Sequence, residues 1–165
     1  MLEYIQKADH GLAWIERGLV VAFTGAIACI MVAQVVMRYF FGAPLFWAEE
    51  ISVQMLVFAT LFGLSLLVRH GQLVTIDFLP NALSPRARHG LSAALGVVML
   101  GLFAFLSWLG WEWIARPEVR IELGATTQLP RWWNYAVLPL AAAMMAWHQL
   151  AAILRELRAF AGGAR

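Results

Sequence analysis

Charged side chains are scarce in this chain of 165 residues. Asp, Glu, Lys and Arg together make up 13% of it, and hydrophobic residues make up 62%. Ordinary globular domains carry about a quarter charged residues and about half apolar ones. A soluble domain of this length lacks the interior to hide so much apolar side chain from water. The composition therefore excludes an ordinary soluble fold and predicts that lipid is the solvent for much of the chain.

Cysteine is nearly absent, since Cys29 is the only one. A single cysteine excludes an intrachain disulfide, a cysteine-based metal cluster and a dithiol redox pair. The four histidines include no pair at the H-x-x-x-H spacing of a helical zinc site, and only His148 falls within an apolar run. We therefore expect no catalytic residue, no metal and no cofactor. We expect His148 to make a polar contact with a neighbouring helix.

A concentrated basic patch is also missing. The 12 Lys and Arg residues exceed the 10 Asp and Glu residues by only two, and they stand in twos and threes between apolar runs. A nucleic-acid surface needs basic residues gathered on one face. The sequence therefore predicts no nucleic-acid partner, and the basic residues serve better as markers of membrane orientation.

Four stretches without Asp, Glu, Lys or Arg cover residues 18–37, 51–68, 91–111 and 132–154. A helix needs about 20 apolar residues to cross a bilayer, and its backbone groups must be hydrogen-bonded within the segment. We predict an all-α polytopic membrane protein with a single membrane domain over residues 1–165 and spans at about 18–37, 48–69, 90–111 and 132–154. Residues 1–17 are predicted to form a short interfacial helix, and Pro139 is expected to kink the last span.

The distribution of positive charge predicts the orientation. Eight Lys and Arg residues fall in the two tails and the middle loop, and four fall in the first and third loops. Positive residues accumulate in short cytoplasmic loops. We therefore predict that both termini and residues 69–88 are cytoplasmic, whereas residues 38–50 and 112–131 lie on the outer side.

No acidic residue falls within any of the four apolar runs. Proton- and sodium-coupled carriers place a carboxylate at membrane depth, where an ionisable group is costly and is retained for function. This absence argues against an independent small oligomeric carrier. The isolated His148 argues against a second alternative, the membrane anchor subunit of a redox enzyme, because haem takes two axial ligands. A subunit that assembles with a partner is the third alternative.

Small residues recur at four-residue spacing in the first two apolar runs, which lets helices approach closely. They are Gly25, Cys29 and Ala33 in the first run and Ala59 and Gly63 in the second. Such rows serve either packing within this chain or docking onto a larger partner.

A group of polar and aromatic residues flanks the first predicted turn, and its members are Gln34, Arg38, Trp47, Glu49, Glu50 and Gln54. Gln34 and Arg38 share one helix face, as do Glu50 and Gln54, because both pairs are four residues apart. We expect Arg38 to pair with Glu49 or Glu50. The group either closes the hairpin or contacts a partner.

Several short motifs resemble those of the small membrane subunit (DctQ-like small permease) of tripartite ATP-independent periplasmic (TRAP) transporters. The motifs are Arg38-Tyr39-Phe40-Phe41-Gly42, Pro44, Trp47-Ala48-Glu49-Glu50, Gly63, Gly71 with Ile76-Asp77, Leu129-Pro130-x-Trp132-Trp133-x-Tyr135 and Leu138-Pro139. They follow the family's order over roughly residues 32–154. The sequence departs from the family at Leu73, where the family often has histidine.

The resemblance implies a non-catalytic subunit of a sodium-coupled importer of a small organic anion, often a carboxylate, in the bacterial inner membrane. It implies two protein partners besides membrane lipid. A large multi-span permease carries the substrate and sodium sites, and a periplasmic solute-binding protein delivers the substrate. The small subunit is expected to be a scaffold for the large one.

Overall fold

The computed structural model describes residues 2–71 and 85–162 and shows a helical protein without a strand in those ranges. Four long helices are α1 (Leu2–Phe40), α2 (Ala48–His70), α4 (Pro85–Ile114) and α7 (Val137–Gly162). Two short helices, α5 (Pro117–Arg120) and α6 (Trp132–Tyr135), lie between α4 and α7. Four segments are long and apolar enough to cross a membrane: Tyr4–Phe40, Ala48–His70, Gly90–Ile114 and Trp132–Arg158. The predicted all-α polytopic fold is confirmed.

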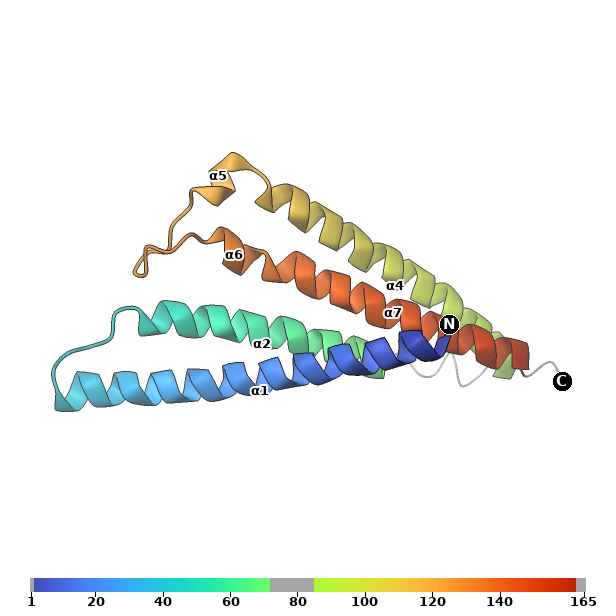
Figure 1. The fold of residues 1–165 in the computed structure, drawn as a ribbon, viewed down its shortest axis with the longest axis horizontal. Helices are drawn as coiled ribbons and strands as arrows, with labels where there is room; N and C mark the ends of the chain where they lie inside the picture. The colour runs from blue at the N-terminus through green and yellow to red at the C-terminus, as the bar shows by residue number, and fades with distance from the viewer. Residues whose placement is uncertain (1, 72–84, 163–165) are drawn as a thin grey trace.

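The helices form two antiparallel hairpins that meet along α2 and α7 (Figure 1). One hairpin pairs α1 with α2, and the other pairs α4 with α7. The four long helices converge at the end that carries both termini. At the opposite end the hairpins splay apart, and α5 and α6 lie there (Figure 1). We refer to these as the terminal end and the loop end.

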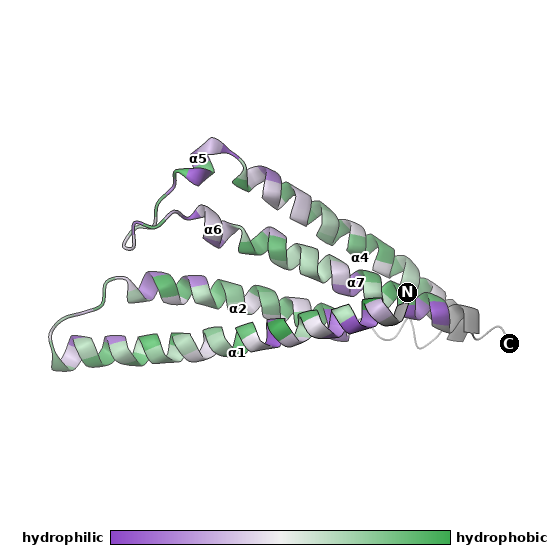
Figure 2. Ribbon diagram, viewed as in Figure 1, coloured by the Kyte–Doolittle hydropathy of each residue, from purple (hydrophilic) through white to green (hydrophobic). Residues whose placement is uncertain are grey.

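Hydrophobic residues cover the middle of each long helix, and hydrophilic residues gather toward the terminal end of α1 and the loop end of α2 (Figure 2). Such an apolar band with polar ends matches the profile of a bilayer. Only 6% of the most apolar window of α1 is buried inside the chain, against 39% for α7. The outer surface of α1 therefore faces lipid or a partner along most of its length.

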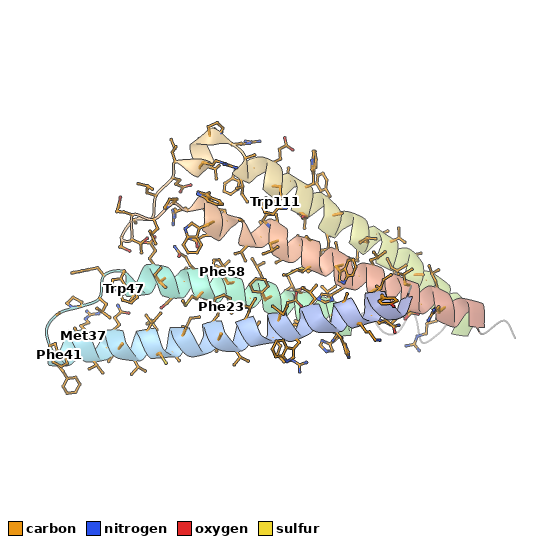
Figure 3. The ribbon with its side chains drawn as sticks, viewed as in Figure 1. Phe23, Met37, Phe41, Trp47, Phe58 and Trp111 are labelled. Atoms are coloured by element: carbon orange, nitrogen blue, oxygen red, sulfur yellow. The ribbon has the colours of Figure 1, made fainter. Side chains whose placement is uncertain are left out.

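The interior is small and built from apolar side chains of three helices. Val68, Phe103, Ala141 and Met145 form its buried cluster. Between α1 and α2, Phe23 faces Phe58 with ring centroids 5.6 Å apart (Figure 3). These rings hold the first hairpin together by edge-to-face packing.

Two glycines permit the close approach of α4 and α7. A Cβ at Gly110 would lie 2.9 Å from the Cβ of Pro139, and one at Gly96 would lie 2.8 Å from Cγ1 of Ile153. Ser107 Oγ adds a hydrogen bond of 3.0 Å to the carbonyl oxygen of Pro139. Close backbone packing combined with a polar contact is the usual way in which helices associate in lipid.

One sequence prediction about the helices is corrected. Residues 2–17 are helical, but they continue into the first span as one helix, α1, rather than forming a separate interfacial helix. The fourth span, Trp132–Arg158, is interrupted at Ala136, one turn before Pro139, between the end of α6 at Tyr135 and the start of α7 at Val137. Pro139 thus stands in the first turn of α7, where proline's missing N–H would have no helical partner anyway.

Candidate functional site

The predicted polar group lies at the loop end, around the first turn of α2 (Ala48–His70). Nε2 of Gln34 donates to Oε1 of Glu49 over 3.2 Å, which joins α1 to α2. Gln54 Nε2 is 3.5 Å from Oε1 of Glu50, one turn along α2. Trp47 is the residue directly before α2, and its side chain is exposed. The structure therefore brings Gln54 close to Glu50, as their spacing predicted, and it also brings Gln34 close to Glu49 across the turn, which the spacing did not predict.

Glu50 has a role that the sequence did not reveal. Its carboxylate accepts hydrogen bonds from the backbone N–H groups of Thr126 and Thr127 at 2.8 and 3.0 Å. Both threonine hydroxyls also donate to it, that of Thr127 at 3.1 Å. A side chain at Gly124 would overlap this carboxylate. Glu50 thus ties the loop between α5 and α6 to the first turn of α2, and we call this arrangement the Glu50 latch.

Arg38 is placed differently from the prediction. Its guanidinium carbon lies 5.9 Å from the ring centroid of Tyr39, and its side chain is exposed. Within residues 2–71 and 85–162, no ion pair joins Arg38 to Glu49 or Glu50. The expected pairing is therefore not formed, because Gln34 and the two threonines occupy the carboxylates. Arg38 is left as a cation on the outside of the hairpin.

A second set of contacts orders the chain between α5 and α6. The guanidinium of Arg131 donates to Glu122 over 3.1 Å, and the hydroxyl of Tyr135 donates to the same oxygen over 3.0 Å. The hydrogen bond with Glu122 raises the pKa of Arg131 above its ordinary value. The backbone of Leu123 pairs with that of Pro130 in an isolated antiparallel bridge. This loop is therefore a defined surface at the loop end.

The predicted small-residue rows are not packed against other helices of this chain. Gly25, Cys29 and Ala33 are exposed on α1, and a Cβ at Gly25 would meet nothing within 4 Å. Ala59 and Gly63 on α2 are half-buried, and Gly63 also has open space around it. Close packing through glycine occurs instead at Gly96 and Gly110. Docking of the rows onto a partner stays a prediction.

The strongest electrostatic feature is a buried polar cluster near the terminal end, which sequence reasoning missed. It consists of Asp9 and Glu16 from α1, Ser65 and Arg69 from α2, and His148 from α7. Glu16, Ser65 and His148 are fully buried, and Asp9 is 2% exposed. Four polar side chains at the meeting point of three helices are thus removed from solvent, and Arg69, whose side chain is 13% exposed, lies at their edge.

The imidazole of His148 is the centre of the polar cluster. Its Nδ1 lies 2.6 Å from Asp9 Oδ1, and its Nε2 lies 2.9 Å from Glu16 Oε2. Ser65 donates to the other oxygen of Glu16 over 2.6 Å. Arg69 Nε donates to the other oxygen of Asp9 over 2.9 Å. Each carboxylate oxygen therefore has a partner, as buried charges require.

The polar cluster satisfies itself and leaves no group directed at a reactant. Both imidazole nitrogens can donate to the two carboxylates only when the ring carries two protons. Its chemistry is therefore that of a buried ionic network that joins α1, α2 and α7. Among the described residues, no group of three His, Cys, Asp or Glu side chains is arranged to hold a metal ion. The predicted polar contact of His148 is confirmed.

A sequence signal for the polar cluster existed but was weak. Asp9, Ala13 and Glu16 are spaced i, i+4, i+7, which places them on one helix face, and all three are buried. Ser65 and Arg69 have the same four-residue spacing on α2. Asp9 and Glu16 lie before the 18–37 run but within the membrane-compatible segment Tyr4–Phe40, so α1 does carry acids near the terminal end.

Three positions compared with the family motifs, Leu73, Ile76 and Asp77, lie outside the described residues.

Comparison with known proteins gives a consistent family. Residues 27–159 match the model of the DctQ component of tripartite ATP-independent periplasmic transporters. The chain is 25% identical over 150 residues to the sialic acid TRAP transporter small permease protein SiaQ of Vibrio cholerae, covering 90% of this chain and 84% of that protein. It is 29% identical over 154 residues to the C4-dicarboxylate TRAP transporter small permease protein DctQ of the same organism, covering 79% of this chain and 66% of that one.

A further relative is much longer than this chain. The sialic acid TRAP transporter permease protein SiaT of Haemophilus influenzae is 29% identical over 146 residues. Those residues are 87% of this chain but 22% of SiaT, so the chain spans about a fifth of that protein. The relatives are transporter subunits and not enzymes, and this chain is likewise not an enzyme. With the family model matching most of the residues that carry the four helices and the Glu50 latch, the chain belongs to the DctQ component family of TRAP transporters.

Proposed function

We propose that this chain is the non-transporting scaffold subunit of a sodium-coupled importer and works only when bound to a large permease subunit. The observation that carries this proposal is the SiaT relative, in which sequence similar to this chain forms about a fifth of a longer permease. The relatives SiaQ and DctQ are small permease proteins, of which the matched part makes up 84% and 66%. The same module thus occurs fused to a larger permease and as a small protein, which supports a permanent contact between the two.

The arrangement of charge supports a scaffold rather than an independent carrier. Asp9 and Glu16, the two acids of the polar cluster, are occupied by His148, Ser65 and Arg69. Glu49 and Glu50 lie at the loop end and are also hydrogen-bonded. A coupled carrier needs a carboxylate that can bind and release an ion at membrane depth. We therefore favour a subunit of a TRAP transporter over the two alternatives, an independent oligomeric carrier and the membrane anchor of a redox enzyme.

The substrate class follows from the relatives' names. SiaQ and SiaT are named for sialic acid, and the two DctQ relatives are named for C4-dicarboxylates. Both names denote organic acids, so the transported molecule is a small organic anion, and we propose a carboxylate. A periplasmic solute-binding protein delivers it, and the surrounding membrane is the bacterial inner membrane.

The loop end offers the surface on which assembly can be tested. Changing Glu50 to Ala removes the acceptor for Thr126 and Thr127, so the Glu50 latch should open. Changing Arg38 to Ala removes an exposed cation without breaking an ion pair. We expect both variants to lower the yield of large permease that co-purifies with the tagged chain several-fold.

Glu118→Ala serves as the control for this assembly experiment, because Glu118 is exposed in α5 and outside the latch. It should co-purify with the large permease like the unchanged chain. Full yield with both Arg38→Ala and Glu50→Ala would show that the hairpin is not an assembly surface. No co-purification of the unchanged chain would contradict the scaffold proposal itself.

We also propose that the terminal end faces the cytoplasm, as the bias in Lys and Arg favours. In a Cys29→Ser background, a cysteine at exposed Glu118 should react in intact cells with a maleimide that cannot cross the inner membrane. A cysteine at exposed Arg158 should react only after the membrane is permeabilised. The opposite labelling pattern would reverse the orientation.

A further inference from the structure

A basic pocket opens beside the polar cluster at the terminal end. It has a volume of about 640 Å³, and the described residues that line it are Gln6, Lys7, Asp9, His10, Arg69 and Arg155. They come from α1, α2 and α7. We propose that this pocket binds a phosphate group, supplied by the headgroup of an anionic phospholipid. This binding site is independent of the transport function proposed above.

The charges of the pocket favour an anion. Two guanidinium groups, those of Arg69 and Arg155, stand beside one carboxylate, that of Asp9. Asp9 is 2% exposed and already accepts from His148 and Arg69. Its negative charge is therefore compensated within the bundle, and Arg155, whose side chain is 40% exposed, adds positive charge at the rim of the pocket.

The guanidinium groups keep donors for that ligand. Arg69 uses Nε for Asp9, and one terminal nitrogen faces His10, which leaves its remaining N–H groups for the pocket. Arg155 approaches Asp9 only to 3.9 Å, which is beyond hydrogen-bond distance, and its side chain is 40% exposed. Guanidinium groups bind phosphate oxygens through paired N–H donors, which makes Arg the preferred residue for this task.

The depth of the pocket matches the headgroup layer. Trp14 is 77% exposed on α1, and tryptophan prefers the boundary between hydrocarbon and headgroups. His10, which lines the pocket, lies four residues closer to the terminus, on the same face as Trp14. At 1.5 Å per residue it stands about 6 Å outside that ring, within a headgroup layer about 5–8 Å thick. A lipid phosphate is thus the anion that this pocket meets.

Basic pockets between membrane helices are known to hold the headgroups of anionic lipids. The test compares two variants of the full chain, purified in neutral detergent micelles and titrated with phosphatidylglycerol or phosphatidylcholine. Native mass spectrometry then measures the fraction of chain with lipid bound. Arg155→Gln removes a pocket cation, whereas Arg158→Gln removes an exposed cation that lies outside the lining on the same helix. Both variants change the net charge by the same amount.

We expect the unchanged chain to bind phosphatidylglycerol more tightly than phosphatidylcholine. Arg155→Gln should weaken phosphatidylglycerol binding about fivefold, which is the contribution of one cation near an anionic lipid surface, and Arg158→Gln should leave it within about twofold. Equal losses in both variants, or no preference for phosphatidylglycerol, would overturn the proposal. Arg155→Gln should not unfold the chain, because Asp9 keeps its bonds to Arg69 and His148.

A second arm separates the two sources of phosphate. Inorganic phosphate at millimolar concentration is added to the chain with and without phosphatidylglycerol. A lipid site predicts that inorganic phosphate does not displace the bound lipid. Displacement of the lipid with the same dependence on Arg155 would support the phosphate site and overturn its assignment to lipid.

Discussion

Replacing Glu16 by Ala is expected to lower the free energy of unfolding by about 3–5 kcal/mol, the usual cost of removing one partner from a buried ion pair. The carboxylate is fully buried and bonds both Ser65 and His148. Its loss leaves a hydroxyl and a ring nitrogen without partners in an apolar bundle. It also removes a link from α1 to α7, beside the link from Asp9 to His148.

The expected consequence is separation of α1 at the terminal end. Along its most apolar window, α1 has little buried surface inside the chain, so packing alone holds it weakly there. Thermal unfolding in micelles, followed by tryptophan fluorescence, should show a lower Tm for Glu16→Ala. Glu118→Ala, an exposed position, should leave Tm unchanged.

The variant Glu16→Gln distinguishes the ionic bond from simple packing. Gln has nearly the shape of Glu and retains an oxygen that accepts from Ser65, but it carries no charge for His148. We expect a Tm between those of the unchanged chain and Glu16→Ala. A Glu16→Ala protein as stable as the unchanged chain would show that the polar cluster does not hold the helices together.

The presence of four long apolar helices could be predicted from the sequence, because lipid permits few solutions. A charge marks a helix end at Arg38, in the last turn of α1, but not at Arg17, through which α1 continues. Pro85 in the first position of α4 and Gly71 after α2 are likewise local signals. Gly71 takes φ 65, a left-handed conformation that favours glycine at a helix end.

The polar cluster could not be predicted in the same way. Asp9 and Glu16 look like charges of a polar tail until His148, more than 130 positions away, is placed beside them. That placement depends on the packing of α7 against α1 and α2, which a hydropathy pattern does not contain. Once the charges are paired, nothing prevents residues 2–17 from continuing the helix, which explains the error about the interfacial helix.

At the loop end, too, contacts between near neighbours could be predicted, whereas contacts between distant residues could not. Gln54 and Glu50 are one helical turn apart on α2, and their spacing predicted that they would meet. The partners of Glu50 lie 76 and 77 residues away in an irregular loop. The sequence does not reveal these donors, so an ion pair with Arg38, the nearest cation in the sequence, was expected for the Glu50 carboxylate.

The chain alone is expected to transport no substrate. Liposomes that contain only this chain should accumulate no sialic acid or C4-dicarboxylate under an inward sodium gradient. The chain has no carboxylate in the middle of a span, and Asp9 and Glu16 are fully engaged in the polar cluster. Coupling of an ion to a substrate therefore requires sites in another subunit.

Reconstituted uptake tests most directly whether this chain transports substrate only together with the large permease. Four preparations are compared with the solute-binding protein and substrate outside: empty liposomes, the chain alone, the large permease alone, and both membrane subunits together. If the chain is a non-transporting scaffold, we expect sodium-dependent uptake by the two subunits together and only the empty-liposome background for the chain alone. Saturable, sodium-driven uptake by the chain alone would contradict it.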